Sequence, residues 1–252
     1  MTVYELYKRL NECYSEDLRC EWDNDGIMCA DSLEREVKKV LIALDVTMDT
    51  VNYACENGYD TIISHHPLVF RAQKSLTPLS YTQGKLIKLV KGGVAVLSFH
   101  TRLDAAQGGV NDALSSVLSL ENVSVDPLDP IGRIGYIASK KSVCEFAESV
   151  KLSLGSPFVL YSGNKDVSKV YVVGGDGKDL IENAIKNGCD TIITGRASYN
   201  TSVDASDIGI NIVEAGHFYT ENPVCYALEE KVKAIDGCIQ TYVFNSNSII
   251  SV

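Results

Sequence analysis

Four histidines are the residues of this chain whose positions most directly suggest chemistry. Each follows a run of β-branched and apolar residues that predicts a β-strand. Parallel α/β sheets bind ligands at the carboxyl ends of their strands. A single histidine is more often structural than a ligand, but four of four at strand ends favour a metal site. They are His65 and His66 after residues 61–64, His100 after residues 94–99, and His217 after residues 210–215.

Two of the histidines have a carboxylate four residues downstream. The pairs are His100 with Asp104 in HTRLD and His217 with Glu221 in HFYTE. Each pair offers one imidazole nitrogen and one carboxylate to a cation. Mixed nitrogen and oxygen ligands without sulfur fit Zn, Fe, Mn, Co or Ni better than Ca, and the sequence does not choose among these metals.

Neither half of the chain holds enough of these residues for two metal ions, which favours one shared site. Pro67 favours an extended backbone before it, so we expect His65 and His66 to point to opposite sides and to serve different ions. Glu221 or a water could bridge two ions that lie about 3.5 to 4 Å apart. The first half would supply His65, His66, Asp104 and, as a further candidate, His100, and the second half would supply His217 and Glu221.

An internal repeat indicates which elements position these residues. Residues 39–64 match residues 169–194 without a gap, and ten of the 26 aligned positions are identical. Both segments read as a strand, an amphipathic helix closed by Asn-Gly, and a second strand, Asp-Thr-Ile-Ile. Such a β-α-β unit crosses over right-handed and belongs to a parallel sheet. The sequence therefore predicts an α/β fold of two similar lobes with mostly parallel sheets.

The boundary between the lobes is expected between residues 125 and 126. The surrounding segment, NVSVDPLDP, contains Asp-Pro twice, and the residue before a proline avoids helix. Residues 1–125 would form the first lobe and residues 126–252 the second, and the C-terminal strand could pack back on the first lobe. Further strands are expected at 94–99, 210–215 and 241–245, and helices at 3–14, 83–91, 105–118, 142–154 and 223–234.

Length and composition narrow the class of protein. The 252 residues, 45% of them hydrophobic, can bury a sizeable core. A net charge of −10 and the lack of a Lys/Arg cluster argue against a nucleic acid partner. Apolar stretches are far shorter than the roughly 20 residues of a membrane span. The charged N-terminus does not read as a signal peptide, so we expect a cytoplasmic protein.

Other residue types receive structural interpretations. The eight cysteines have no zinc-type spacing, so we expect buried free thiols. The glycines of residues 174–177 lie between a strand and a helix, which favours a tight turn over an anion contact. Residues 22–24, Trp-Asp-Asn, are expected to serve packing and a turn.

The motifs SHHPLVF, HTRLDAAQGGVND and GHFYTENP, together with WDNDG and GGDGKDLI, resemble those of the NIF3 family, also called GTP cyclohydrolase I type 2 homologues. The resemblance covers the whole chain. It implies a two-lobed α/β fold without an inserted domain, a dinuclear metal centre and a toroidal homohexamer. It also implies that His100 lies beside the metals, as a weak ligand or a proton carrier. The implied metal ligands are His65, His66, Asp104, His217 and Glu221.

Two arginines depart from the pattern that the resemblance implies. Arg102 stands where the family usually has Asn, and Arg196 stands in TGRASYN where Thr-Gly-Glu is typical. Either guanidinium could bind a phosphate or carboxylate of a substrate by bidentate contacts. Structural salt bridges are the favoured interpretation of each.

Together these features predict a metal-dependent hydrolase of the cyclohydrolase or phosphohydrolase type, with two divalent ions and a small-molecule substrate. Two ions lower the pKa of a coordinated water and polarise the substrate. The alternative is a non-catalytic metal-binding scaffold, such as a metal chaperone or a regulatory protein. The sequence does not identify the metal or the substrate.

Overall fold

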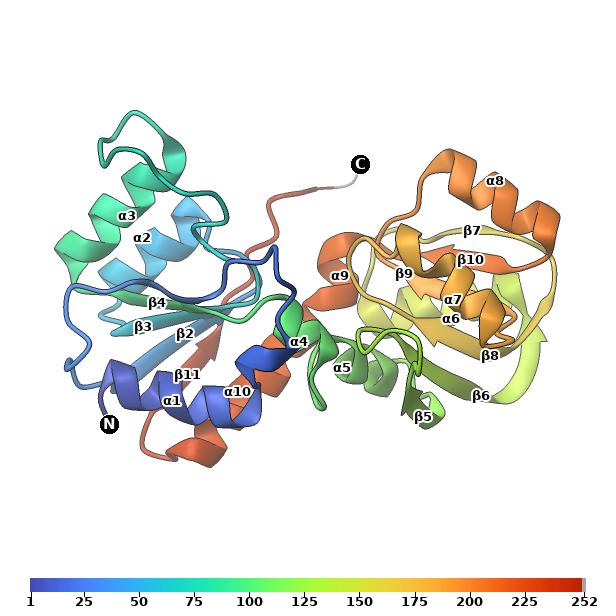
Figure 1. Ribbon diagram of the computed structural model, residues 1–252, viewed down its shortest axis with the longest axis horizontal. Coiled ribbons are helices and arrows are strands. Elements are labelled where there is room, and N and C mark those ends of the chain that lie inside the picture. Colours follow the sequence, from blue (N-terminus) through green and yellow to red (C-terminus); the bar gives the residue numbers. More distant parts are fainter. Residues whose placement is uncertain (251–252) are drawn as a thin grey trace. The chain divides into compact units, whose positions relative to one another are not determined.

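The computed structural model describes residues 1–250 and divides into two compact units (Figure 1). The first comprises residues 1–103 and 224–248, and the second comprises residues 104–223 together with Ile249 and Ile250. This division differs from the expected boundary at residues 125 and 126. Residues 104–125 belong to the second unit because the helix and the strand that they contain pack on its sheet.

The first unit is a five-stranded sheet, within residues 1–250, in the order β1-β4-β3-β2-β11. The strands from β4 to β11 run parallel, and β1 pairs antiparallel with β4 at one edge. The strands are β1 Gly26–Cys29, β2 Lys39–Ala43, β3 Thr61–Ser64, β4 Ala95–Ser98 and β11 Gln240–Val243.

Helices cover both faces of this sheet (Figure 1). They are α1 Val3–Cys13, the 3-10 helix η1 Glu16–Leu18, α2 Met48–Glu56, α3 Tyr81–Gly92 and α10 Pro223–Ile235. Helices α2 and α3 lie on one face, and α1 and α10 lie on the other. All residues of β3 and β4 are buried, which is the pattern expected of a parallel sheet that is covered on both sides.

The second unit has a six-stranded sheet, within the same described residues, in the order β5-β6-β8-β9-β10-β7. Only β8, β9 and β10 run parallel, and the other pairs are antiparallel. The strands are β5 Glu121–Val125, β6 Arg133–Ser142, β7 Leu160–Ser162, β8 Asp166–Val172, β9 Thr191–Thr194 and β10 Asn211–Glu214.

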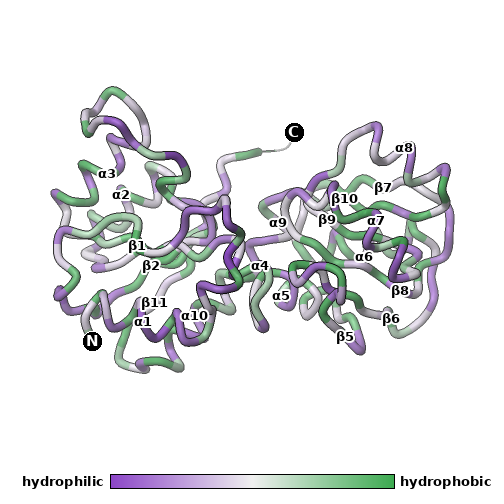
Figure 2. Tube along the Cα trace, viewed as in Figure 1, coloured by the Kyte–Doolittle hydropathy of each residue, from purple (hydrophilic) through white to green (hydrophobic). Residues whose placement is uncertain are grey.

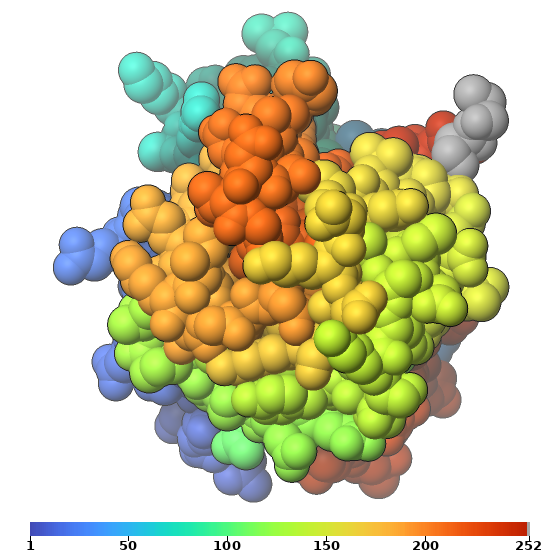
Figure 3. All heavy atoms as spheres, turned by 90° about the vertical axis from the view of Figure 1, so that its right-hand side faces the viewer, coloured from blue at the N-terminus to red at the C-terminus, as the bar shows by residue number. Residues whose placement is uncertain are grey.

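The helices of this unit include four short ones and three longer ones. They are α4 Thr101–Ala105, α5 Val110–Val117, α6 Val143–Leu154, η2 Lys178–Leu180, α7 Ile181–Lys186, α8 Tyr199–Ile208 and α9 His217–Glu221. Helix α4 begins in the first unit and ends in the second. In the space-filling view, α8 (orange) stands out as a ridge on the surface of the second unit (Figure 3).

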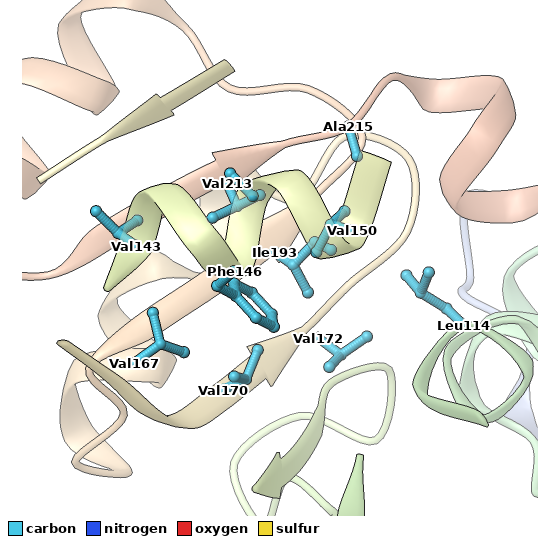
Figure 4. Packing of buried hydrophobic residues seen from close by; sticks show 11 residues of the cluster. Leu114, Val143, Phe146, Val150, Val167, Val170, Val172, Ile193, Val213 and Ala215 are labelled. Atoms are coloured by element: carbon cyan, nitrogen blue, oxygen red, sulfur yellow. The ribbon is translucent and has the colours of Figure 1, made fainter. Parts of the chain in front are cut away.

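One hydrophobic core of the second unit lies between α6 and the sheet, and a second cluster includes Tyr171, Ile192 and Ile212. Phe146 and Val150 of α6 pack toward Val170 and Val172 of β8 and toward Ile193 of β9 (Figure 4). A hydropathy colouring shows the same layering, because the strands of both sheets are mostly hydrophobic and hydrophilic residues gather in the surrounding helices and loops (Figure 2). Burial of such apolar side chains is the main stabilising term of each unit.

The predicted repeat is confirmed, because both copies make the same backbone-anchoring contacts. Asp60 Oδ2 accepts hydrogen bonds of 2.8 Å from the N–H groups of Lys38 and Lys39. Asp190 Oδ2, its counterpart, accepts bonds of 3.0 and 2.9 Å from residues 168–169. The Asn-Gly closures also match, since Gly58 and Gly188 have φ values of +67° and +66°. These left-handed positions explain why glycine ends both helices.

Several local predictions were wrong. Residues 122–130 are not only a connector, since β5 occupies their first half and pairs with β6. The helix expected at 105–118 forms only over α5, residues 110–117, because residues 106–109 (Ala-Gln-Gly-Gly) separate it from α4, which ends at Ala105. Strands β1, β6 and β7 were not expected. They pair antiparallel and are less completely buried than β3 and β4, so their apolar signal is weaker than that of buried parallel strands.

Not all cysteines are the buried thiols that were expected. Cys189 is buried, whereas Cys13, Cys144 and Cys238 are exposed. Among residues 1–250, no helix combines the length and the apolar composition that crossing a membrane requires.

Candidate metal centre

Two adjacent histidines follow β3, the middle strand of the first sheet. His65 is fully buried, and its Nδ1 lies 3.0 Å from the carbonyl oxygen of Phe99. His66 Nδ1 lies 2.8 Å from Asp45 Oδ1. The Ser64 hydroxyl donates a hydrogen bond of 2.9 Å to the His66 carbonyl oxygen, which fixes the backbone bend at the two histidines. Both rings are therefore held through Nδ1 by an acceptor.

The third histidine of this unit, His100, follows β4 and is held in the same way. Its Nδ1 lies 2.8 Å from Asp23 Oδ1. The other Asp23 oxygen accepts hydrogen bonds from the Thr101 N–H at 3.0 Å and from the Thr101 hydroxyl at 2.6 Å. Burial raises the pKa of the Asp23 carboxyl, but the bonds from His100 and Thr101 outweigh it and hold the pKa well below its usual range. Asp23 is thus an ionised anchor for the His100 ring.

The three imidazoles converge. Their ring centroids lie 4.8 Å apart for His65 and His66, and 5.3 and 5.7 Å from His100. One ring nitrogen from each lies within 4.8 Å of the others, so the group could hold a metal ion. A neutral imidazole that donates through Nδ1 carries its lone pair on Nε2, and metal-binding histidines are usually oriented by such acceptors. The donor set of the first unit therefore fits a transition metal.

The expected opposite orientation of His65 and His66 was wrong. The backbone bends after β3 at these residues, so the alternation of an extended strand does not continue through them. The two rings lie on the same side, with centroids 4.8 Å apart and one nitrogen of each within 4.8 Å of the other. The prediction that the two histidines serve different ions stays a prediction.

In the second unit, a histidine and two carboxylates form a group around the short helix α9. His217 Nε2 lies 3.0 Å from Glu221 Oε2, one helical turn away. One carboxylate oxygen of Asp104 lies within 4.8 Å of one of Glu221. Glu221 is buried, whereas His217 is 45% exposed in its side chain. This unit supplies a negatively charged donor set, and the first unit supplies imidazoles.

The glycine-rich turn after β8 makes room for Glu221. Gly175 has φ +66°, and a Cβ there would lie 2.2 Å from Glu221 Oε1 and 3.3 Å from His217 Nε2. A Cβ at Gly195, after β9, would lie 2.6 Å from Thr220 Oγ1 and 2.7 Å from the Cα of His217. Glycine is therefore required where these two turns approach α9. Residues 174–177 therefore form the tight turn that was expected. This turn also closely approaches Glu221, a candidate metal ligand.

The structure thus gathers the candidate residues into two groups. His65, His66 and His100 form one group in the first unit, and Asp104, His217 and Glu221 form the other in the second unit. Sequence reasoning missed the orienting carboxylates Asp23 and Asp45. Asp45 could have been found, since it lies at the carboxyl end of β2, where ligand-facing residues of α/β sheets gather. Asp23 lies on a loop, and only tertiary contacts reveal its partner.

Arg102 does not face a substrate. Its side chain is fully buried, and Nε and Nη2 make a bidentate pair with the Asp25 carboxylate at 2.7 and 2.8 Å. Nη1 donates to Asn11 Oδ1 at 2.6 Å. The favoured structural salt bridge is confirmed for Arg102, and the anion-binding alternative was wrong. Arg196 is exposed, and its backbone forms a bridge with Asp176, so its role stays a prediction.

Comparisons with known proteins agree with this fold. The family model for Duf34/NIF3 (NGG1p interacting factor 3) matches residues 1–248. A Clostridium perfringens protein named GTP cyclohydrolase 1 type 2 homolog is 34% identical over 241 residues, which cover 92% of each chain. Its Clostridium acetobutylicum namesake is 32% identical over 261 aligned residues, covering 100% of this chain and 96% of the relative.

A solved structure, that of the hypothetical protein SA1388 from Staphylococcus aureus, matches with a TM-score of 0.92 at 25% identity. The match covers 100% of this chain and 99% of the other. The two-sheet α/β architecture, the family model across nearly the whole chain and the relatives above 30% identity all agree, and the chain belongs to the Duf34/NIF3 family.

Proposed function

We propose that this protein binds two divalent metal ions and uses them to hydrolyse a small-molecule substrate. The observation that carries the proposal is the convergence of three imidazoles, each held through Nδ1 by an acceptor. Gathering one ring nitrogen of each of three imidazoles within 4.8 Å of the others brings little to packing, whereas it suits a cation.

The ligands proposed are those that the sequence suggested. The first unit gives two imidazoles and the second unit gives one imidazole with two carboxylates. A pair of divalent ions would carry four positive charges, and the two carboxylates would neutralise two of them. The remaining positive charge would keep the ions electrophilic. The proposed ligands are His65, His66, Asp104, His217 and Glu221, and the metal is Zn, Fe, Mn, Co or Ni.

When bound, a pair of such ions supplies Lewis acidity and brings the pKa of water to about 7. The chain itself supplies the proton transfer. His100 is the proposed acid or base, because Asp23 fixes its ring at 2.8 Å from Nδ1. A histidine that carries a proton between water and a leaving group needs this orientation, and a positioned group of this kind contributes roughly a hundredfold or more in rate.

The substrate class is proposed from the relatives. Those at 34% and 32% identity carry the name GTP cyclohydrolase 1 type 2 homolog, which describes opening of a ring by water. Hydrolysis of a cyclic amide-like bond or of a phosphoester needs the same activated water and a polarised oxygen. A metal-binding scaffold without turnover is the alternative that the test must separate.

Metal content tests the ligand set. Element analysis of the purified protein should give about two ions per chain, the number in a two-metal site. His66→Ala and Glu221→Ala should each reduce that number. Glu182→Ala is the matched control, because Glu182 is a largely exposed carboxylate of the second unit and its change should leave the metal content unaltered. Equal metal content in all four proteins would refute the ligand assignment.

Turnover separates the enzyme from the scaffold. The protein is reconstituted with each of the five metals and assayed against nucleotides, phosphoesters and cyclic amides. Turnover that falls at least about a hundredfold in His100→Gln at unchanged metal content supports the proton-transfer role. Loss of metal in the same variant would make His100 a ligand instead. No turnover with any metal, together with rapid exchange of the ions, would favour the scaffold.

We also propose that the protein assembles as a toroidal homohexamer, as the family resemblance implies. Native mass spectrometry should show six copies of the chain. A monomer or dimer at micromolar concentration would contradict the assembly without affecting the metal test.

A location in the cytoplasm is proposed as well. The exposed thiols of Cys13, Cys144 and Cys238 support it, because exposed thiols persist where the compartment is reducing. Cell fractionation with a tagged chain would check the location.

A further inference from the structure

Two large aromatic side chains of the first unit are exposed beside His100. Trp22 is 65% exposed and Phe70 is 47% exposed. Leaving such rings in water forgoes the hydrophobic stabilisation that their burial would give. Exposed apolar groups beside polar functional residues commonly mark a ligand-binding surface.

Both rings sit on anchored backbone. The segment around Trp22 is fixed on each side, since Cys20 N–H donates to Thr101 Oγ1 at 3.0 Å and Asp23 N–H donates to the Cys20 carbonyl at 3.0 Å. The Asn24 side-chain amide donates to the Val69 carbonyl, directly before Phe70. The two loops are thereby tied to one another, and the positions of the rings are set by these bonds.

The rings form a rim around His100. Trp22 and Phe70 lie 6.2 Å apart between centroids, with an interplanar angle of 71°. Each also lies 6.2 Å from the His100 ring, at 76° and 88°. All three contacts are edge-on, so none of them uses the face-to-face stacking that an indole can make. The rim borders the imidazole group that could hold a metal.

We infer that Trp22 and Phe70 bind the planar aromatic ring of the substrate and present it to His100, so that the protein prefers aromatic over saturated rings. This inference rests on the proposed function for the identity of the site, and it adds the class of substrate. An aromatic ring can stack on the indole face, while a saturated ring of the same size gains only its area of contact. Stacking of a planar base on an aromatic side chain changes binding by roughly 5- to 150-fold.

The chain offers a direct readout, because Trp22 is its only tryptophan. Its fluorescence is followed while benzamide, nicotinamide or cyclohexanecarboxamide is titrated in, with and without Zn²⁺. Benzamide and cyclohexanecarboxamide share the amide and differ in the ring. We expect both aromatic amides to bind at least about fivefold more tightly than the saturated amide and to change the Trp22 emission. Saturation-transfer NMR on the ligand protons provides the same comparison for variants without tryptophan.

Variants locate the preference. Trp22→Leu and Phe70→Leu should each reduce it, and Trp22→Phe should retain most of it, because a phenyl ring still offers a face. Tyr81→Leu is the matched control, since Tyr81 is 79% exposed on α3 of the same unit and should not affect binding. Circular dichroism and metal content of each variant verify that the fold is intact.

The outcomes separate this inference from the proposed function. Equal affinity for the aromatic and saturated amides in a protein that holds its metals overturns the aromatic rim and leaves the metal proposal standing. Aromatic preference that is lost in Trp22→Leu supports the rim, even where element analysis rejects the metals. Trp22→Leu that alters the oligomeric state and not the amide preference identifies the rings as a contact between copies of the chain, and the inference fails.

Discussion

The two units build the same β-α-β motif and differ at the turn that follows its first strand. In the first unit this turn carries Asp45, whose carboxylate holds the His66 ring at 2.8 Å. The aligned residue in the second unit is Gly175, where a Cβ would lie 2.2 Å from Glu221 Oε1. The first unit uses a side chain to orient the candidate ligand His66, and the second unit omits a side chain where the candidate ligand Glu221 lies. The repeat therefore supplies a common frame on which two different donor sets are placed.

The second strands of the two motifs show the same contrast. In the first unit the strand continues into His65 and His66, and in the second it continues into Gly195 and Arg196. A Cβ at Gly195 would collide with α9. The aligned position of the first unit has room for the fully buried ring of His65. The anchoring bonds of Asp60 and Asp190 are nevertheless equivalent. The two units share the backbone geometry of the motif, and they differ in the side chains that follow its strands.

The largest effect is expected from Arg102→Met, which breaks the frame of the first unit. The variant removes the bidentate guanidinium from the buried Asp25 carboxylate and leaves it only the 3.4 Å pair with the partly exposed Arg19. Such a loss costs about 3 to 5 kcal/mol. Denaturant unfolding measures it, with Arg9→Met as the control, because the Arg9 pair with Glu12 is exposed. Adding Asp25→Leu to Arg102→Met should recover much of the stability, since no unpaired charge then stays buried; equal loss in the single and double variants would contradict a pair-based cost.

Gly175→Ala tests the second unit at the diverged turn. Alanine brings both a strained positive φ and a collision with Glu221 Oε1. Gly188→Ala is the matched control, with the same φ of +66° and no atom within 4 Å of its Cβ. Strain alone costs about 1 kcal/mol, so Gly175→Ala should lose about 1 to 3 kcal/mol more than the control. Gly175→Ala should also lower the metal content. Similar losses in the two variants would show that the missing side chain at Gly175 is not needed to make room for Glu221.

Asp45→Ala tests the corresponding turn of the first unit. Removing the acceptor of His66 Nδ1 frees the ring to rotate and weakens Nε2 as a ligand. Metal affinity should fall about 10- to 100-fold, as it does when orienting partners of ligating histidines are removed. Competition with a chelator measures the affinity. Asp49→Ala, an exposed carboxylate in the first turn of α2, should leave it unchanged. An unaltered metal affinity in Asp45→Ala would contradict the assignment of His66 as a metal ligand.

The smallest effect concerns pH and lies in the second unit. Asp126 is buried, which raises the pKa of its carboxyl, but hydrogen bonds from Leu128 N–H, Tyr171 and Asn187 hold the net pKa below its usual value. A depressed folded-state pKa stabilises the fold above the unfolded pKa of about 3.9, and the contribution declines below that pH and is lost as pH falls through the folded-state pKa. Asp126→Asn should therefore be less stable at pH 7 and should approach the parent protein at pH 3 in thermal unfolding. A constant difference between them would reject this assignment.

Strands and helices with a strong periodic signal could be predicted from the sequence. Residues 61–64 and 191–194 are apolar and β-branched between turn signals, and both are fully buried central strands. Strand β6 begins with three buried residues, 133–135, and continues with exposed and half-buried ones without a clear alternation, so its pattern did not distinguish it from a loop. Its place is decided by pairing with β8, a contact with residues more than 20 positions away.

The sequence by itself determined the frame and the candidate ligands. Histidines after predicted strands must gather at one edge of a parallel sheet, because all parallel strands end there. Only the tertiary structure decided how the rings are held and where they point. Asp23 reaches His100 across 77 positions of the chain, and at the bend after β3 the rings of His65 and His66 lie 4.8 Å apart between centroids. Hydrogen bonds between distant segments have no periodicity in the sequence, so the carboxylates that orient the imidazoles could be recognised only in the folded chain.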